Sequence, residues 1–312
     1  MKILVLGAGA IGGYFGARLV QSGADVQFLV RERRCAQLRD RGLVVKSPFG
    51  DFTVPAKTVL REQIESPADL LLLTCKAYDL DAAIDAIGPA MGPSTHVLPL
   101  LNGLAHLDAL RSAFGAARVA AGSVGIPATL TADGDVVQLG TFHRISFGGL
   151  PGTSADVLPK LQVLRDFFAA TPVTVELAED MMLGLWEKFV GLATLAAMTC
   201  LMRSSAGDIL RTDEGAALMA EAFDVCDRAA RAAGHTPRAA AMVPFKAMLT
   251  DRASPMMASM LRDLEGGGRT EGEHIVGDML ARARAAGIDP GPLRHAWVHL
   301  QAAENRRQRE AS

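Results

Sequence analysis

The sequence predicts an α/β N-terminal domain of the Rossmann, dinucleotide-binding type, followed by an all-α C-terminal domain. Three observations support this fold class. A short apolar run at residues 2–6 passes directly into a glycine-rich loop and then into helix-forming residues. Apolar runs of strand length alternate with helical segments as far as about residue 178, an order typical of a parallel sheet. From about residue 179 such runs vanish, and Ala, Leu, Met and Arg at helical spacing fill the remainder.

The glycine-rich loop has the pattern G-x-G-x-x-G. Gly7 permits a tight turn, Gly9 lets the backbone approach a pyrophosphate, and Gly12 lets the helix pack close to the strand. Ala10 and Ile11 stand at the start of the helix, where free backbone N–H groups would hold the phosphates. The alternative is a glycine turn that binds nothing. The position of the loop between a first strand and a helix favours the cofactor site.

The second predicted strand, residues 25–30, ends at Arg31, Arg33 and Arg34. In NAD-binding versions of this fold an acidic side chain accepts the adenosine ribose 2′-hydroxyl at this place, whereas arginine pairs with a 2′-phosphate. We therefore predict NADPH as the cofactor, with Arg31 as its main contact. The alternative is a solvated run of charge that opens a helix at residues 31–41.

The rest of the N-terminal domain alternates strands and helices. A hairpin is expected at residues 43–46 and 52–56, and a continuously apolar, buried parallel strand at 69–73. Further strands are expected at 96–101, 118–125, 136–139, 144–147 and 173–177, helices at 79–90 and 154–170, and a hairpin turn at Asp133-Gly134.

Lys76 and Asn102 each directly follow one of these strands. Open α/β sheets bind ligands in the crevice beyond the carboxyl ends of their strands. Both residues are therefore expected where a nicotinamide and its substrate would lie. The alternatives are a solvated lysine at a strand end and an ordinary Asn-Gly turn.

The length of 312 residues suits two domains, which we place at 1–178 and 179–312. Lys and Arg number 32 against 34 Asp and Glu, so the charge balance does not indicate a nucleic-acid partner or an acidic membrane surface. The N-terminus has no signal-peptide pattern, and no uninterrupted apolar run reaches the ~18–20 residues of a membrane span. The four cysteines show neither a C-x-x-C pair nor metal-ligand spacing, which fits reduced thiols in the cytoplasm.

The C-terminal domain is expected to contain helices at 180–202, 213–233, 237–250, 255–264, 270–286 and 291–309. The most apolar stretch, Phe189 to Met202, is interpreted as a buried helix. Methionines in this half could form the face of a homodimer, or could equally be ordinary core fillers. The oligomeric state is left open.

Six motifs follow one another along the chain: the G-A-G-A-I-G-G start, T-C-K at Lys76, L-N-G at Asn102, L-W-E-K-F at Lys188, S-M-L-R-D from Ser259 and R-T-E at Glu271. Their order resembles that of the ketopantoate reductase (2-dehydropantoate 2-reductase) family. The likeness covers nearly the whole chain, and the two C-terminal motifs are more specific than the glycine loop.

The resemblance implies NADPH-dependent reduction of a 2-oxo acid to a 2-hydroxy acid in a cleft between the two domains. The catalytic lysine of the family falls on Lys188. Its second cleft lysine and its cofactor-side asparagine fall on Lys76 and Asn102, which we assign to both substrate and cofactor. Its substrate-binding serine and glutamate fall on Ser259 and Glu271, and we assign Glu271 a catalytic role as well.

The chemistry agrees with these residue types. A hydride arriving at a ketone carbon leaves negative charge on oxygen, and a protonated amine there stabilises charge that exists only in the transition state. Lys188 could instead extend along a helix face beside Trp186, with its amine in water. Glu271 could complement a helix dipole.

The chain departs from the family pattern on the helix of Lys188. The family carries asparagines one and two turns after its catalytic lysine, whereas this chain has Leu192 and Ala196. Thr194, Thr199 or Ser205 could compensate. Otherwise the preferred 2-oxo acid is expected to be less polar than ketopantoate.

Two other functions compete with this interpretation. Another two-domain reductase, acting on 3-hydroxy acids or opines, would not explain the C-terminal motifs. A sensor that binds NADPH without chemistry would not explain the retained Lys76, Lys188 and Glu271.

Overall fold

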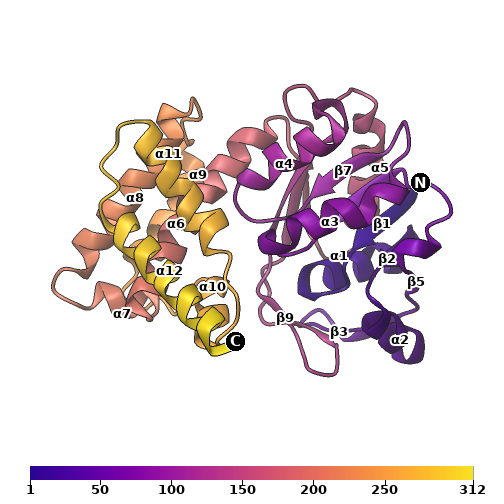
Figure 1. Cartoon of the computed structure of the whole chain (residues 1–312), viewed down its shortest axis with the longest axis horizontal. Coiled ribbons are helices and arrows are strands. Elements are labelled where there is room, and N and C mark those ends of the chain that lie inside the picture. The colour runs from indigo at the N-terminus through magenta and orange to yellow at the C-terminus, as the bar shows by residue number, and fades with distance from the viewer. Residues whose placement is uncertain (312) are drawn as a thin grey trace. The chain divides into compact units, whose positions relative to one another are not determined.

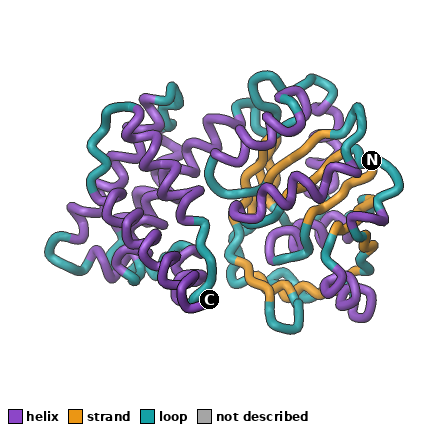
Figure 2. Tube along the Cα trace, viewed as in Figure 1, coloured by secondary structure: helices purple, strands orange, loops and turns teal. Residues whose placement is uncertain are grey.

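The computed structural model describes residues 1–311, which form two compact units (Figure 1). The first unit comprises Met1–Leu101 and His106–Met181. The second comprises Asn102–Ala105 and the chain from Met182 onward. In the described residues all the strands belong to the first unit, and the second is built from helices and loops (Figure 2). The predicted class, a Rossmann-type α/β domain followed by a helical domain, is therefore confirmed.

The first unit is organised around a five-stranded parallel sheet in the order β5-β2-β1-β6-β7. Ile3 in the central strand pairs with Val26 on one side and with Leu70 on the other. The whole of β6 is buried, which explains its continuous apolar run, because both faces of a parallel sheet are covered. The strands are β1 (Lys2–Leu6), β2 (Asp25–Leu29), β5 (Lys57–Val59), β6 (Leu70–Leu73) and β7 (His96–Pro99).

Five α-helices belong mainly to this unit. They are α1 (Ala10–Gln21), α2 (Glu32–Arg41), α3 (Leu80–Ile87), α4 (Ala105–Phe114) and α5 (Val157–Ala169). The first helix packs close to the sheet, since a Cβ at Gly16 would lie 2.4 Å from the Phe28 ring. Sequence analysis did not identify α4 or the short β5.

Two smaller sheets complete the first unit. Their strands are β3 (Leu43–Lys46), β4 (Phe52–Val54), β8 (Ala121–Gly125), β9 (Ala128–Leu130), β10 (Val136–Gln138), β11 (Arg144–Gly148) and β12 (Thr174–Leu177). Both predicted hairpins are present, because β3 pairs antiparallel with β4 and β9 with β10. The glycine of the predicted turn, Gly134, has a positive φ of 82°. Parallel pairing of β3 with β10 joins the hairpins into one four-stranded sheet.

The second unit contains α6 (Met181–Met202), α7 (Ala206–Leu210), α8 (Gly215–Ala232), α9 (Ala239–Thr250), α10 (Ser259–Glu265), α11 (Asp278–Ala285) and α12 (Pro292–Ala311). The predicted helix at 255–264 starts four residues late. Its first part is extended because Met256 accepts a backbone hydrogen bond from Ala206 and the Ala258 N–H donates to Thr199 Oγ1.

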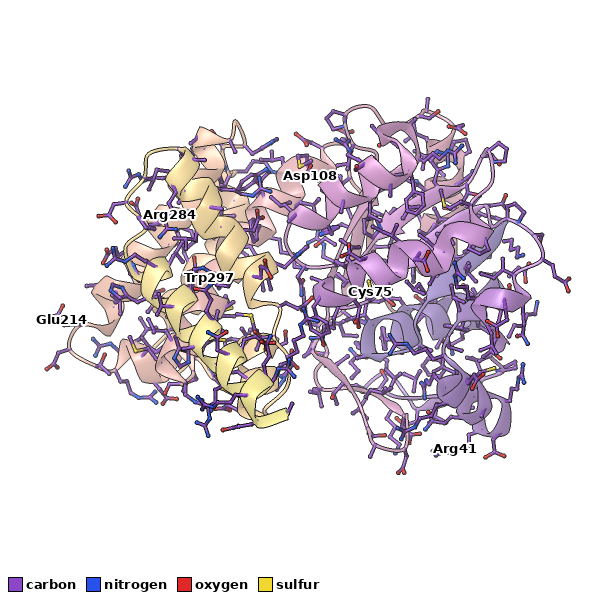
Figure 3. The ribbon with its side chains drawn as sticks, in the orientation of Figure 1. Arg41, Cys75, Asp108, Glu214, Arg284 and Trp297 are labelled. Atoms are coloured by element: carbon purple, nitrogen blue, oxygen red, sulfur yellow. The ribbon has the colours of Figure 1, made fainter. Side chains whose placement is uncertain are left out.

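The predicted helix at 270–286 is also modified, because it opens with a π-helical turn at Glu273–Gly277. The absence of a side chain at Gly277 makes room for Trp297 of α12, whose ring would lie 3.2 Å from a Cβ there. Figure 3 labels this tryptophan on its helix.

The central helix of the second unit is α6. By length and composition it could cross a membrane, yet 78% of its most apolar 18-residue window is buried inside the protein. A helix that is apolar on all sides is expected in the core of a globular domain. The prediction of a buried helix at this place is thus confirmed.

Candidate active site

The glycine loop of the first unit has the geometry of a pyrophosphate cradle. Gly7 adopts a φ of +91°, which favours glycine. A Cβ at Gly12 would lie 2.3 Å from both the Gly7 carbonyl oxygen and the Thr74 hydroxyl, so any side chain there would force the helix off the strand. A Cβ at Gly9 would meet nothing within 4 Å. Gly9 therefore leaves open space directly at the N-terminus of α1.

Free backbone donors face this space. Gly9 is the N-cap of α1 and provides no side-chain cap, and the first turn carries no acidic residue. The N–H groups of Ala10, Ile11 and Gly12 precede the first intrahelical bond, which Gly13 donates to Gly9. Such an N-terminus attracts anions. These residues therefore fit the diphosphate of a dinucleotide.

The Arg34 guanidinium is hydrogen-bonded to the backbone of the glycine loop, a role that sequence analysis missed. It donates from Nε and an NH2 group to the Ala8 carbonyl oxygen at 3.1 and 2.8 Å, and also to the Gly134 carbonyl at 2.9 Å. The sequence showed Arg34 only as one member of a charged run. The carbonyl groups that accept from Arg34 are 26 and 100 residues away in the sequence, so no local sequence pattern predicts these contacts.

Arg31, the predicted 2′-phosphate contact, is the N-cap residue of α2 directly after β2, and it is exposed. Arg33 is exposed as well. Because Arg34 is committed to backbone carbonyls, Arg31 and Arg33 are the members of the run with side chains open to solvent.

Lys76 follows β6 and precedes a short 3₁₀ turn at Ala77–Asp79. It is partly buried and belongs to the first unit. Since β6 is parallel to the adjacent β1, Lys76 and the glycine loop lie at the same carboxyl edge of the sheet. Ligands bind at this edge in folds of this type.

Asn102 groups with the helical unit, although it directly continues the first unit's chain. Its side-chain oxygen accepts a hydrogen bond of 2.9 Å from the Lys188 amine. The next residue, Gly103, has a φ of +79°, and a Cβ there would lie 2.8 Å from the His274 carbonyl oxygen. This close approach explains why the segment packs with the helices.

Lys188 lies on α6 and is partly buried. Loss of solvent lowers the pKa of its amine to about 8, an effect that the nearby Glu271 carboxylate partly opposes. Glu271 itself is only 7% exposed. The structure thus brings together three of the predicted residues, Asn102, Lys188 and Glu271, from positions 86 and 83 residues apart in the sequence.

Ser259, the predicted substrate-binding serine, is the first residue of α10 and is exposed. Its hydroxyl makes no hydrogen bond with any side chain or backbone group of residues 1–311. It is therefore open to a ligand, but it is not bonded to the group around Lys188.

The face of α6 beyond Lys188 is apolar. Leu192 is partly buried and Ala196 fully buried, one and two turns further along the helix. Thr194 and Thr199 are fully buried, and each donates its hydroxyl proton to the carbonyl four residues back. Ser205 instead caps α7. Each of the three candidate replacements for the family asparagines therefore already has a hydrogen-bond partner of its own.

Comparisons with known proteins identify the family of the chain. A family model described as "Ketopantoate reductase PanE/ApbA" matches residues 3–152, and the model of its C-terminal part matches residues 180–302. An uncharacterized oxidoreductase of Bacillus subtilis, YkpB, is 30% identical over 305 residues, which cover 97% of this chain and 99% of the relative.

Solved structures share the fold over the whole length. A PanE/ApbA family ketopantoate reductase from Ralstonia eutropha is 26% identical with a TM-score of 0.86, covering 99% of this chain and 100% of that one. A D-mandelate dehydrogenase, solved with NADH and anilino(oxo)acetate, is 20% identical with the same TM-score and the same coverage. The family models and the full-length relative show that this chain belongs to the ketopantoate reductase (PanE/ApbA) family of oxidoreductases.

Proposed function

We propose that the protein is a reductase that uses NADPH to convert a 2-oxo acid into a 2-hydroxy acid. The observation that carries this proposal is the desolvated Lys188 amine, hydrogen-bonded to Asn102 and close to the buried Glu271 carboxylate. Ionisable groups whose pKa is shifted by desolvation and by a specific charged partner cluster at functional sites.

In this proposal Lys188 is the general acid. When the diphosphate of NADPH is bound at the glycine loop, the reduced nicotinamide of the same molecule would supply the hydride for the carbonyl carbon. The Lys188 ammonium donates its proton to the carbonyl oxygen, so the ketone gains one hydride and one proton and becomes an alcohol. A pKa of about 8 leaves the amine mostly protonated at neutral pH, yet makes it a stronger acid than an ordinary lysine.

The other groups orient the amine and the substrate. Asn102 accepts from the Lys188 amine and so restricts its direction. The Glu271 carboxylate favours the charged form of the amine and offers an acceptor for the substrate hydroxyl. Ser259 and Lys76 supply donors for a substrate carboxylate. Arg31 is proposed to hold the 2′-phosphate that distinguishes NADPH from NADH.

The apolar face of α6 favours a substrate less polar than ketopantoate. Leu192 and Ala196 donate no side-chain hydrogen bonds, and the hydroxyls of Thr194 and Thr199 are taken up within the helix. Each missing hydrogen bond to a neutral group weakens binding by about 0.5–1.5 kcal/mol. A substrate with a hydrocarbon side chain forms no hydrogen bonds there, so it loses no binding free energy at this apolar surface.

The test is oxidation of NADPH, followed by absorbance, with ketopantoate and with a panel of branched and aromatic 2-oxo acids. We expect turnover with several members and the highest kcat/KM for an apolar one. Superiority of ketopantoate would retain the reductase but contradict the substrate preference. Failure of every 2-oxo acid to consume NADPH would favour a non-catalytic sensor.

A further inference from the structure

A ring from a neighbouring helix occupies a gap in α6 beside Lys188. Gly191 follows Lys188 by three residues, so the two positions are neighbours on the helix surface. A Cβ at Gly191 would lie 2.1 to 2.6 Å from three atoms of the Phe245 ring. Phe245 on α9 therefore fills the volume that a side chain at 191 would take.

The contact between this ring and α6 lies one turn from Lys188. Positions three residues apart on a helix are neighbours on its surface. The Phe245 ring therefore packs on α6 at the turn that follows Lys188.

Phe245 belongs to the inward face of α9. Met242 and Leu249 stand three residues before it and four after it, and both are buried, at 3% and 4% exposure. Val243 on the opposite face is 62% exposed. Phe245 itself is only partly buried. The ring thus packs on α6 without being fully enclosed by the protein.

The start of α9 is fixed to the residue that precedes Lys188. Arg238, the N-cap of α9, donates to the Glu187 carboxylate from its backbone N–H, from Nε and from an NH2 group, at 2.9, 2.8 and 2.7 Å. The Glu187 side chain is only 6% exposed. A buried carboxylate needs such partners, so this end of α9 has one position.

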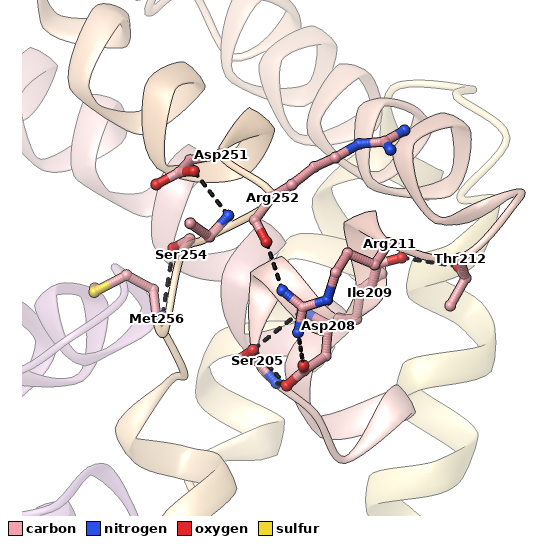
Figure 4. A network of polar contacts seen from close by, with 10 residues as sticks. Ser205, Asp208, Ile209, Arg211, Thr212, Asp251, Arg252, Ser254 and Met256 are labelled. Carbon is pink, nitrogen blue, oxygen red and sulfur yellow. Dashed lines mark hydrogen bonds and ion pairs between the residues drawn. The ribbon is translucent and has the colours of Figure 1, made fainter.

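The chain that leaves α9 is fixed to α7 (Figure 4). Arg211 donates to the Arg252 carbonyl oxygen at 2.6 Å, and the Gly207 N–H donates to the Ser254 carbonyl at 2.9 Å. A Cβ at Gly207 would lie 2.6 Å from that carbonyl oxygen. With both ends held, α9 cannot easily carry Phe245 away from α6.

We propose that Phe245, seated on Gly191, determines substrate specificity by forming an apolar wall against the side chain of the 2-oxo acid. This inference rests on the proposed function and names its substrate class: 2-oxo acids whose side chain is a branched or aromatic hydrocarbon. Phe245 supplies the wall, and the partly buried Leu192 supplies the adjoining apolar surface. Small 2-oxo acids such as pyruvate are too short to gain from it.

The experiment compares kcat/KM for 3-methyl-2-oxobutanoate, phenylglyoxylate and pyruvate in the full-length enzyme with NADPH. Phe245→Ala is expected to lower the ratio of 3-methyl-2-oxobutanoate to pyruvate by about 10-fold or more, since apolar contacts of one or two methyl groups are worth about that factor. The turnover of saturating pyruvate is expected to change less than about twofold. Gly191→Ala, which displaces the ring without removing it, is expected to lower the same ratio.

Two further variants separate specificity from folding. Phe245→Leu keeps apolar volume on α6 but removes the flat ring. It should preserve the ratio of 3-methyl-2-oxobutanoate to pyruvate within about threefold and reduce the relative activity on phenylglyoxylate. It also serves as the test if the alanine variant does not fold. Val243→Ala, on the exposed face of the same helix, is the matched control and should leave all ratios unchanged.

The outcomes are distinct. A wild-type enzyme that oxidises NADPH with these acids, combined with ratios unchanged within about twofold in Phe245→Ala and Phe245→Leu, overturns the inference and leaves the reductase intact. A wild-type protein that turns over none of the acids overturns the proposed function and removes the inference with it.

Discussion

The two units build their candidate sites from different parts of the chain. In the first, the anion cradle is made of backbone N–H groups and glycines within six consecutive residues, Gly7 to Gly12. In the second, the surroundings of the Lys188 amine come from Asn102 and Glu271, which are distant in sequence. A site made of backbone is encoded locally and can be recognised in a sequence. A site made of side chains depends on packing. The sequence can suggest which residues belong to it, but not which of them are in contact.

Lys188 gives the largest expected difference between the two sites. In the proposed reaction its charge acts on the transition state and not on the cofactor. Lys188→Met is expected to lower kcat by about 10²- to 10⁴-fold, the usual contribution of a positioned acid. The dissociation constant for NADPH, from fluorescence titration, should stay within about threefold, since the glycine loop belongs to the other unit. Lys246→Met, on an exposed lysine of α9, is the control. A loss of less than tenfold would contradict the role of Lys188.

Within the glycine loop, two substitutions of the same size should act differently. Gly9→Ala points into open space, so we expect an unchanged melting temperature but NADPH binding weaker by about 10- to 100-fold, since hydrogen bonds to a charged phosphate are lost. Gly12→Ala would collide with Gly7 and Thr74 and should lower the free energy of unfolding by about 1–3 kcal/mol. Thermal unfolding and titration of both variants test this. Equal loss of stability in the two would contradict the cradle.

The preference for NADPH over NADH tests whether the Arg31 side chain adds a contact to the cofactor site formed by the backbone of the glycine loop. Arg31→Asp is expected to lower the preference for NADPH over NADH by about 10- to 100-fold, because a charge-assisted contact to the 2′-phosphate is replaced by repulsion. The measurement is kcat/KM for each cofactor. Arg33→Asp is the matched control, two residues along the same run. If Arg33→Asp alone changes the preference, the contact is assigned to the wrong arginine.

The pH dependence of the reaction tests the account of the buried amine without any substitution. Lys188 is active when protonated, and burial lowers its pKa to about 8, so kcat/KM should be constant below that pH and fall about tenfold per unit above it. Lys188→Arg keeps its charge over this range, and whatever activity it retains should not show the decline. A wild-type profile that stays flat to pH 10 would contradict the shift.

The lowered pKa of Lys188 also affects stability, in the opposite direction to its effect on activity. Between about 8 and the ordinary value of 10.5, the unfolded chain holds the Lys188 proton more tightly than the folded protein does. This group therefore makes the free energy of unfolding rise with pH in that window. The contribution should disappear in Lys188→Met.

The sequence by itself determined the elements whose signals are local. Strand β6 is a four-residue apolar run, the loop at Gly7 needs glycine for its backbone angles, and α6 is predominantly apolar. These features follow from backbone geometry and from the burial that each short segment requires. They were sufficient for the fold class, whereas the family was recognised from the motifs at Lys188, Ser259 and Glu271.

Only the tertiary structure decided which side chains meet. It placed Asn102 with the helical unit, turned Arg34 toward the carbonyl of Ala8, used the hydroxyls of Thr194 and Thr199 inside α6, and seated Phe245 on Gly191. The partners of these residues on other elements are tens of residues away, and their contacts depend on how helices and loops pack. Periodicity reports which face of an element is buried, but it does not report what lies against that face.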